Sequence, residues 1–345
     1  MPTQTTTPCV VFPELFERPI VTQFDLANAS SDGGAVLLKA ADARLGLIEE
    51  LARSVRDERM PGKVDHKLPE LLSQRIFGLA CGYEDCNDAA RLAHDPVHKM
   101  LVGRDPVLGD SLASQPTLSR LENAVGPRDL YRMGETLVAT VVDRHRLRLG
   151  RTCRQVTIDL DSTVDPTHGA QQLSLFHGHY DTWCYLPLLG FLSFDDEAEQ
   201  YLFTALLRPG NARDRLGVLG VLGRVIPQVR SAFPGARILV RLDGGFGGPE
   251  ILDFLDDQPR VDYVIGFARN SVLARSARGL MGKARKMSRR SKRTEHVYGD
   301  CRYRAGTWSH DRRIIIKAEV VRLDGRDPKD NARFVVTNLR QTPRW

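Results

Sequence analysis

Two aspartates lie two residues apart in the segment QVTIDLDSTVDPTHG, residues 155–169. Val156, Ile158 and Leu160 alternate with polar residues, which is typical of a strand with one buried face. Asp159 and Asp161 then share the opposite face, about 6.6 Å apart along the strand. Two carboxylates this close raise each other's pKa unless a cation lies between them. The pattern therefore predicts a site for a divalent metal ion, with Asp159 and Asp161 as candidate ligands.

A third aspartate, Asp243, ends another apolar segment, ARILVRLD, and precedes the glycine-rich sequence GGFGG. Glycines let a backbone approach closely, and Mg²⁺ prefers a few carboxylates together with water and substrate phosphate. If the two strands are neighbours, Asp161 and Asp243 meet at one edge of the sheet. Two metal ions held there activate an attacking oxygen and stabilise the leaving one.

The order of the predicted elements places those two strands side by side. From residue 151 onwards the apolar patterns predict three strands, a helix, a strand, a helix and a strand. This order is that of the ribonuclease-H-like α/β fold, in which the first and fourth strands are adjacent. The predicted elements are strands at 155–162, 185–194 and 199–207, a helix at 211–233, a strand at 236–243, a helix at 250–257 and a strand at 261–268. We therefore expect a catalytic core over residues 151–345.

Residues 1–150 have the apolar spacing of helices, and we expect an all-helical N-terminal domain. One helix is expected to follow the capping residues Ser30, Ser31 and Asp32, and a shorter one to begin at Thr117. Short helices joined by tight turns are compatible with a helix-turn-helix, in which Arg120 and Asn123 face DNA. An ordinary helical bundle is the alternative.

Charge is distributed unevenly along a chain whose formal net charge is +6. Between Tyr263 and Thr294 there are ten Lys and Arg residues and no Asp or Glu. We expect a basic, strand-rich insertion, in which segment 269–293 contacts phosphates and is followed by two strand-like stretches, RRIIIKAEVVRL and ARFVVTNL. A solvated surface or a loop is the alternative for the basic segment. The candidate DNA-binding residues here are Arg285, Lys286, Arg289, Arg290, Lys292 and Arg293.

Composition excludes several classes of protein. The 345 residues contain 42% hydrophobic and 27% charged residues, as in globular proteins with a sizeable core. The six cysteines form no C-x-x-C pair, which argues against a zinc ribbon or a disulfide scaffold. No leader-like or membrane-spanning stretch occurs, so we expect a cytoplasmic protein without membrane contact.

Several motifs together resemble the bacterial insertion-sequence transposases of the DDE type. They are IDLDSTVDPTHG, FHGHYDTWCYLPLL, VRLDGGF, ARFVVTNL, LPELLSQRIFGLACGYEDCNDAARLAHDP and SQPTLSRLEN. The resemblance is to the thirteen-eighty group, within the assemblage that includes the IS-four branch. It implies that Asp161 and Asp243 are catalytic and that Mg²⁺ or Mn²⁺ is the cofactor. It also implies double-stranded DNA as the partner, as terminal inverted repeats and target, with a homodimer expected on that DNA.

The sequence departs from this family in its third acid. The family places a Glu in Y-x-x-R-x-x-x-E-x-x-x-x-x-x-K, whereas no tyrosine here has an arginine three residues later. We therefore expect a C-terminally truncated transposase that binds terminal-repeat DNA but cleaves it far more slowly than a chain with the missing helix, with Glu319 and Glu295 as weak substitutes. The alternatives are a truncated DNA-binding product that regulates transposition and a ribonuclease-H-like nuclease.

Overall fold

The computed structural model describes the backbone of residues 9–12, 20–23, 29–169 and 171–342. Contacts divide the chain into an N-terminal unit, Met1–Met133, and a C-terminal unit, Gly134–Trp345. The division lies earlier than the expected boundary at residue 150. It falls inside helix α7, Pro127–Leu149, whose Val138 and Val142 belong to the core of the C-terminal unit.

The N-terminal unit is helical from residue 29 onwards but is not all-helical as predicted. Strand β1, Cys9–Phe12, pairs antiparallel with β2, Ile20–Gln23. Leu72, Phe77 and Leu101 contribute to the main core of the helical part. Its helices are α1 (Ala35–Leu45), α2 (Leu47–Ser54), α3 (Leu68–Ala80), α4 (Ala89–Leu92), α5 (Pro96–Leu101) and α6 (Gln115–Ala124), with short 3₁₀ turns at Pro61–Lys63 and Cys86–Asp88.

Two predicted helix starts are corrected in this unit. The helix expected after Asp32 is two helices, because Gly46 adopts a left-handed backbone with φ of 67° between α1 and α2. The Asp32 carboxylate caps neither helix and instead accepts hydrogen bonds from the Tyr83 hydroxyl at 2.8 Å and His98 Nε2 at 2.9 Å. Helix α6 begins at Gln115, two residues before Thr117, with Ser114 at its N-cap.

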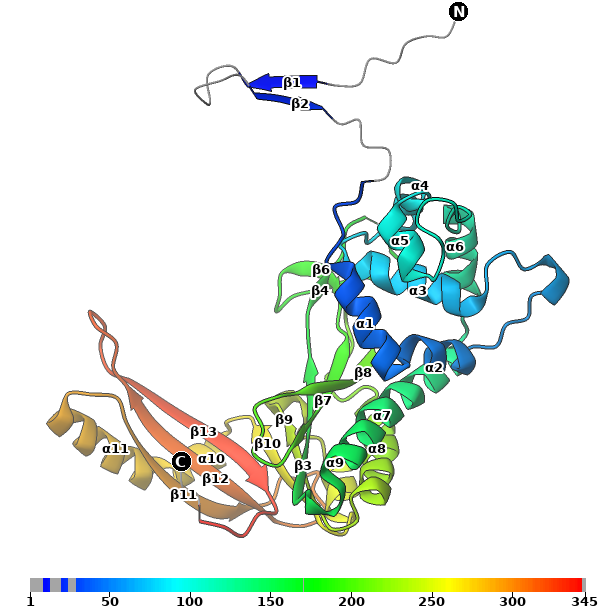
Figure 1. Cartoon of the computed structure of the whole chain (residues 1–345). Coiled ribbons are helices and arrows are strands. Elements are labelled where there is room, and N and C mark those ends of the chain that lie inside the picture. Colours follow the sequence, from blue (N-terminus) through cyan, green and yellow to red (C-terminus); the bar gives the residue numbers. More distant parts are fainter. Residues whose placement is uncertain (1–8, 13–19, 24–28, 170, 343–345) are drawn as a thin grey trace, which may run out of the picture. The chain divides into compact units, whose positions relative to one another are not determined.

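The C-terminal unit is built on one large mixed sheet (Figure 1). Its strand order is β11-β12-β13-β10-β9-β3-β7-β8. The first and fourth predicted strands, β3 and β9, pair in parallel, as expected. The strands are β3 (Gln155–Ser162), β7 (Leu188–Phe194), β8 (Tyr201–Leu206), β9 (Arg237–Leu242), β10 (Val261–Phe267), β11 (Glu295–Tyr303), β12 (Arg312–Val321) and β13 (Lys329–Thr337).

A smaller sheet branches from the chain between β3 and β7. Strand β6, Thr182–Tyr185, pairs antiparallel with both β4, Asp165–Pro166, and β5, Leu175–His177. The small sheet contacts the turn after β8, where Gly210 leaves no room for a side chain because a Cβ would lie 2.1 Å from the Cys184 carbonyl oxygen.

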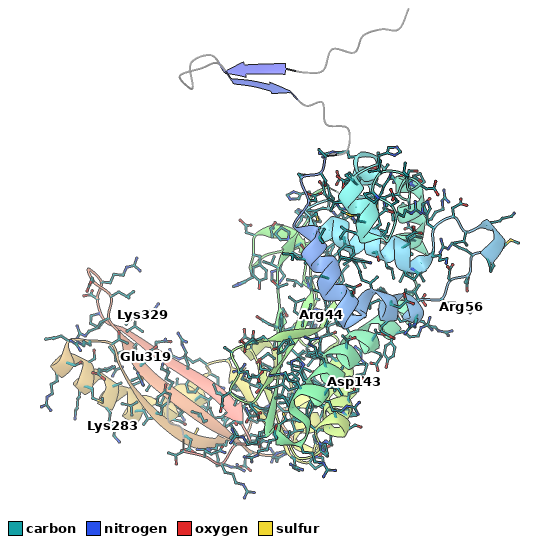
Figure 2. All side chains as sticks on the ribbon, in the orientation of Figure 1. Arg44, Arg56, Asp143, Lys283, Glu319 and Lys329 are labelled. Carbon is teal, nitrogen blue, oxygen red and sulfur yellow. The ribbon has the colours of Figure 1, made fainter. Side chains whose placement is uncertain are left out.

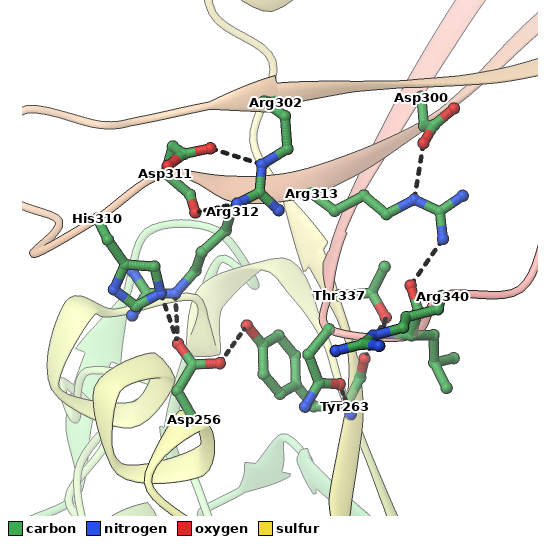
Figure 3. Close-up of a pocket in the computed structure, with 12 residues that line it drawn as sticks. Asp256, Tyr263, Asp300, Arg302, His310, Asp311, Arg312, Arg313, Thr337 and Arg340 are labelled. Carbon is green, nitrogen blue, oxygen red and sulfur yellow. Dashed lines mark hydrogen bonds and ion pairs between the residues drawn. The ribbon is translucent and has the colours of Figure 1, made fainter.

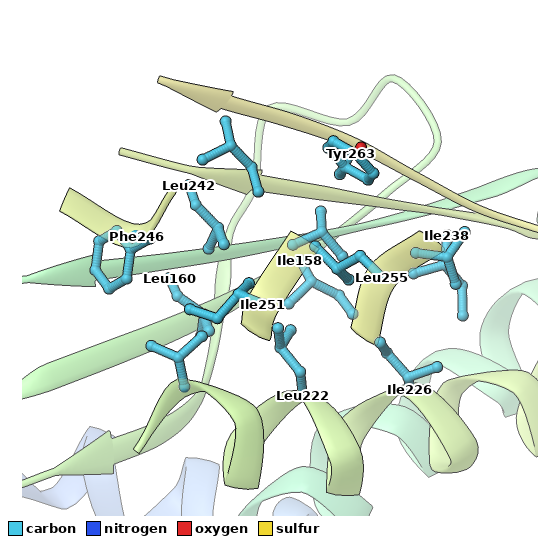
Figure 4. Close-up of a cluster of buried hydrophobic side chains, with 14 of the residues drawn as sticks. Ile158, Leu160, Leu222, Ile226, Ile238, Leu242, Phe246, Ile251, Leu255 and Tyr263 are labelled. Carbon is cyan, nitrogen blue, oxygen red and sulfur yellow. The ribbon is translucent and has the colours of Figure 1, made fainter. Parts of the chain in front are cut away.

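Two helices cover the buried face of β3, β9 and β10 (Figure 4). They are α8, Val218–Ala232, and α9, Pro249–Asp256, and both present aliphatic side chains to the strands. Leu222 and Ile226 of α8 and Ile251 of α9 are fully buried there. Helix α8 starts seven residues later than the predicted residue 211, because Gly217 adopts a φ of 87° that ends the preceding loop.

The basic segment is mainly helical, and the two strand-like stretches predicted after it are β12 and β13. It forms α10, Ser271–Ser276, and α11, Arg278–Ser291. Met281 and Ala284 of α11 pack with Ala318 and Val320 of β12, so the helix covers the outer strands of the sheet (Figure 1). These strands are not an insertion separate from the core, because β13 pairs antiparallel with β10.

The described part of the chain has no helix with the length and apolarity needed to cross a lipid bilayer.

Candidate metal centre and nucleic-acid interface

Asp161 and Asp243 lie at the same edge of the large sheet. In the parallel pairing of β3 with β9, Leu160 lies opposite Leu242. Asp161 directly follows Leu160, and Asp243 directly follows Leu242. Adjacent strands are about 4.8 Å apart, so the two backbones are neighbours at this edge. Both aspartates are exposed, and the arrangement is the one that the sequence predicted.

The electrostatics of this edge favour a cation. Partial burial raises the pKa of Asp161, and the negative charges of Asp243 and Asp214 raise it further. No ion pair engages Asp161, Asp214 or Asp243 within the described residues. Asp161 therefore lies in a negative field and has no ion-pair partner in the described part of the protein.

Asp159 is placed differently from the expectation that it holds metal with Asp161. Its two carboxylate oxygens accept hydrogen bonds from Arg241 Nε at 2.7 Å and Nη2 at 2.6 Å. Arg241 is directly opposite Asp159 in the β3–β9 pairing. This bidentate pair supplies the cation that the alternating aspartates require, so Asp159 has an arginine partner and Asp161 does not.

The glycines after Asp243 leave space for a side chain from another segment. A Cβ at Gly245 would lie 1.8 Å from Oδ2 of Asp214, whereas a Cβ at Gly244 would make only ordinary contacts at 3.7 Å and beyond. Asp214 was missed by the sequence reasoning because it lies in the segment predicted as helix, and no spacing in the sequence marks it.

The two glutamates considered as substitutes for a third acid lie elsewhere in the sheet. Glu319 is in β12, four strands from β3 in the sheet order, which corresponds to about 19 Å. It is already paired with Lys317 at 2.8 Å and with Asn331 at 3.0 Å. The hydrogen bond from Lys317 lowers the pKa of Glu319, although burial opposes this. Glu295 lies still farther away by strand order, at the start of β11.

Two other clusters have the residue types of a metal site. Asp32, Cys81 and His98 form one, and Asp253, Asp256 and His310 the other. In the second cluster Arg312 already donates hydrogen bonds to both aspartates, and Figure 3 shows the resulting network of ion pairs around Asp256. In the first cluster the Asp32 carboxylate accepts hydrogen bonds from Tyr83 and His98. On these contacts alone neither cluster is assigned a metal.

Helix α11 and the two residues that follow it, Lys292 and Arg293, expose the predicted DNA-binding cations. Five of them have no ion pair among the described residues: Lys286, Arg289, Arg290, Lys292 and Arg293. Arg285 differs because its Nε donates to Asp330 at 3.0 Å, so part of its charge is neutralised. Lys283 also projects from this helix (Figure 2). The buried face of α11 anchors on the sheet while these cations face solvent.

Arg120 and Asn123 are exposed on α6, as predicted. The Asn123 side-chain amide donates to the Ser119 carbonyl at 2.8 Å. Arg120 also lines a cavity of about 1050 Å³ within the N-terminal unit, together with Arg59, Lys63 and Arg128. Acidic residues, including Asp57, Asp65 and Asp129, line the same cavity. All of these residues belong to the N-terminal unit, whereas α11 belongs to the C-terminal unit.

The sequence as a whole matches one protein-family model. The model described as transposase DDE domain, group 1, covers residues 12–345. The chain belongs to the DDE transposases. These transposases are in general DNA phosphoryl-transfer enzymes that use divalent metal ions. No curated protein matches the chain.

The donor set of the transposase fits such a metal ion. Asp161 and Asp243 offer only oxygen ligands, and they lie at an exposed edge without a cation partner in the described residues. Hard divalent cations prefer oxygen ligands.

Proposed function

We propose that this chain acts on DNA as the transposase of an insertion sequence, binding the element ends and catalysing metal-dependent strand cleavage and transfer. We place its catalytic centre on a ribonuclease-H-like core formed by β8, β7, β3, β9 and β10. One observation carries the proposal. Asp161 and Asp243 lie on adjacent parallel strands at one exposed edge, without a cation partner among the described residues, in a chain of the DDE family.

Asp161 and Asp243 are the residues that would hold Mg²⁺ or Mn²⁺. When bound, the metal supplies activation of the attacking oxygen and stabilisation of the leaving oxygen in an in-line displacement. The protein contributes position. Strand pairing between β3 and β9 fixes the two aspartates, and the Asp159–Arg241 pair holds the same two strands together two residues before them. Because both aspartates are exposed, a DNA backbone has access to them.

The proposed DNA contacts lie on two surfaces. In the C-terminal unit they are the exposed cations of α11, and in the N-terminal unit they are Arg120 and Asn123 of α6. Lys and Arg side chains that contact phosphates release counterions, so binding weakens as salt rises. We further propose that the terminal inverted repeats are the specific target, that the DNA-bound form is a homodimer, and that the chain belongs to the thirteen-eighty group.

Titration calorimetry with Mn²⁺ tests the metal site. We expect Asp161→Ala and Asp243→Ala to weaken Mn²⁺ binding by about tenfold or more, because each removes an oxygen ligand. Asp196→Asn is the matched control, since Asp196 is an exposed aspartate in the turn after β7. Equal affinity of the wild type and Asp243→Ala would remove Asp243 from the site.

A salt titration of DNA binding tests the contribution of α11. Replacing Arg289, Arg290, Lys292 and Arg293 with Ala should flatten log K against log salt by about 0.9 for each phosphate that the protein no longer neutralises. Arg302→Ala should leave the slope unchanged, because Asp311 already accepts a hydrogen bond from this guanidinium. An unchanged slope in the fourfold variant would show that these four cations do not contact DNA.

Mg²⁺-dependent nicking of a labelled element end distinguishes the enzyme from its alternatives. A transposase nicks the end, and Asp161→Ala abolishes the nicking. Binding without nicking would favour the DNA-binding regulator, and preferential cleavage of an RNA–DNA hybrid would favour a nuclease.

A further inference from the structure

Three side chains of the types that bind transition metals meet in the N-terminal unit. They are Asp32, just before α1, Cys81, the C-cap residue of α3, and His98 in α5. A carboxylate oxygen, the thiol sulfur and an imidazole nitrogen all lie within 4.8 Å of one another. The ligands of a tetrahedral Zn²⁺ ion, at about 2.0–2.3 Å from the metal, lie roughly 3.3–3.8 Å apart. Shifts of about 1 Å or less therefore bring these three atoms to coordinating distance.

The fold holds the three residues at the edge of a hydrophobic core. Helices α1, α3 and α5 contact one another (Figure 1). Cys81 packs against the core that includes Leu101 of α5. His98 is 1% exposed, whereas Asp32 and Cys81 are partly exposed. The cluster is thus closed on the side of His98 and open to solvent on the side of Asp32 and Cys81.

The charges around the cluster favour a cation. Although burial opposes the shift, hydrogen bonds from Tyr83 and His98 lower the pKa of Asp32, so this carboxylate is ionised near neutral pH. Burial raises the pKa of the Cys81 thiol, and the negative charges of Asp32 and Asp95 raise it further. No Lys or Arg forms an ion pair with Asp32 or Asp95 in the part of the chain that the structure describes. A bound divalent ion neutralises this field and stabilises the thiolate.

Hydrogen bonds inside the cluster account for only some of its members. The Asp32 carboxylate accepts from the Tyr83 hydroxyl at 2.8 Å and lies 2.9 Å from His98 Nε2, so these three side chains have partners without a metal. The Cys81 thiol does not, because among the described residues no hydrogen bond or disulfide engages it. A thiolate beside an imidazole and a carboxylate is a ligand set that Zn²⁺ accepts.

We propose that Asp32, Cys81 and His98 bind Zn²⁺, and that the ion connects the start of α1 to α3 and α5. Helix α1 buries only Ala35 along its described length, so packing alone holds it weakly. Zn²⁺ fits better than Mg²⁺, because a thiolate favours the softer ion and Mg²⁺ takes oxygen ligands. Water takes the fourth position. The inference does not depend on the function proposed above, because this cluster lies in the N-terminal unit.

Cobalt substitution in the full chain tests whether the thiol is a ligand. Co²⁺ occupies tetrahedral Zn²⁺ sites, and a thiolate ligand gives an intense sulfur-to-cobalt charge-transfer absorption. Under reducing conditions we expect this absorption in the wild type and its loss in Cys81→Ser. Cys301→Ser is the matched control, because Cys301 is also a partly exposed free cysteine but lies in the C-terminal unit. Absence of the absorption in the wild type, or an equal absorption in Cys81→Ser, would overturn the proposal.

Titration calorimetry with Zn²⁺ tests the other two ligands. We expect Asp32→Asn and His98→Gln each to weaken Zn²⁺ binding on the order of tenfold or more. Asp110→Asn and His94→Gln are the matched controls, because both residues are exposed in the same unit. Wild-type Zn²⁺ affinity in Asp32→Asn and His98→Gln would remove these residues from the site and contradict the proposal.

Thermal unfolding separates loss of the metal from loss of the fold. Without metal, Cys81→Ser should melt close to the wild type, because the replaced thiol makes no hydrogen bond in the described structure. Zn²⁺ at about 100 times its Kd should raise the melting temperature of the wild type, since the ion binds the folded state, and should raise that of Cys81→Ser much less. An equal rise in both proteins would show that Zn²⁺ binds elsewhere.

Discussion

His145 shows how one buried side chain makes stability depend on pH. It lies in α7, is 2% exposed and stacks on Phe194 with ring centroids 4.2 Å apart. Its Nδ1 donates to the Val141 carbonyl oxygen at 2.8 Å. Burial lowers the pKa of His145 below its ordinary value of 6.5, although the Val141 hydrogen bond opposes this. The folded state therefore holds the neutral imidazole and resists protonation.

The expected consequence is a loss of stability on acidification. Because the folded pKa is lower than the unfolded one, the unfolded state binds the proton more readily, and the free energy of unfolding falls as pH drops below about 6.5. His145→Phe should keep the stacking and reduce this slope. Urea unfolding at about pH 7.5 and about pH 5.5, on either side of the ordinary pKa of 6.5, measures this pH dependence of stability. His179→Gln is the control, because His179 is exposed. A wild-type slope in His145→Phe would mean that other groups cause the dependence.

Asp243 allows a second prediction at the scale of one residue. Its negative charge raises the pKa of Asp161, which means that the two carboxylates repel in the metal-free protein. Asp243→Asn should therefore raise the melting temperature in the presence of a chelator while weakening Mn²⁺ binding. Asp196→Asn should change neither quantity. A lower melting temperature for Asp243→Asn without metal would show that the carboxylate makes a stabilising contact.

At the scale of elements, β7 shows how close packing positions strand β3. Gly190 faces β3 and β8, and a Cβ there would lie 2.8 Å from Leu160 Cδ2 and 2.6 Å from Thr204 Cγ2. Leu160 precedes Asp161, so the close approach of β7 bears directly on the strand that ends at the site. A larger residue at this position has no space unless the strands separate.

Gly190→Ala should therefore destabilise the C-terminal unit by about 1–3 kcal/mol, as overpacking of a tight core does. Gly223→Ala, in α8, is the matched control. No atom lies within 4 Å of its added methyl group, and alanine is favoured in helices by about 0.5–1 kcal/mol. Denaturant unfolding measures both changes. Equal stability in Gly190→Ala and the wild type would contradict the tight contact.

At the scale of the whole molecule, the two units have separate hydrophobic cores. Leu101, only 1% exposed, belongs to the N-terminal core, whereas Asp161 and Asp243 belong to the C-terminal unit. Metal binding at these aspartates should thus require only the C-terminal unit to be folded.

Leu101→Ala should lower the stability of the N-terminal unit by about 2–5 kcal/mol, because it leaves a cavity in that core. Mn²⁺ affinity should remain that of the wild type. Leu37→Ala is the control, since Leu37 is 76% exposed on α1. Thermal unfolding and Mn²⁺ titration of the same samples measure both quantities. A parallel loss of Mn²⁺ affinity in Leu101→Ala would show that the site depends on the N-terminal unit.

The sequence by itself determined the features that depend on local pattern. Alternation in 155–162 predicted β3, and the order of elements predicted its parallel neighbour β9, so Asp161 and Asp243 were expected at one edge. The Lys and Arg content alone identified the basic segment. The spacing of its uncharged residues did not predict that the segment is helical. These predictions succeed because side-chain period and net charge are properties of short segments.

Tertiary structure decided which carboxylates lie together without an arginine partner. Asp159 and Asp161 are equivalent in the sequence pattern, but only Asp159 lies opposite Arg241, 82 residues away along the chain. The buried Arg208 connects the Asp214 backbone to Ser162, the residue after Asp161, again across a long separation in sequence. Such contacts depend on strand register and on the hydrogen-bonding needs of a buried guanidinium, which exist only once the chain is folded.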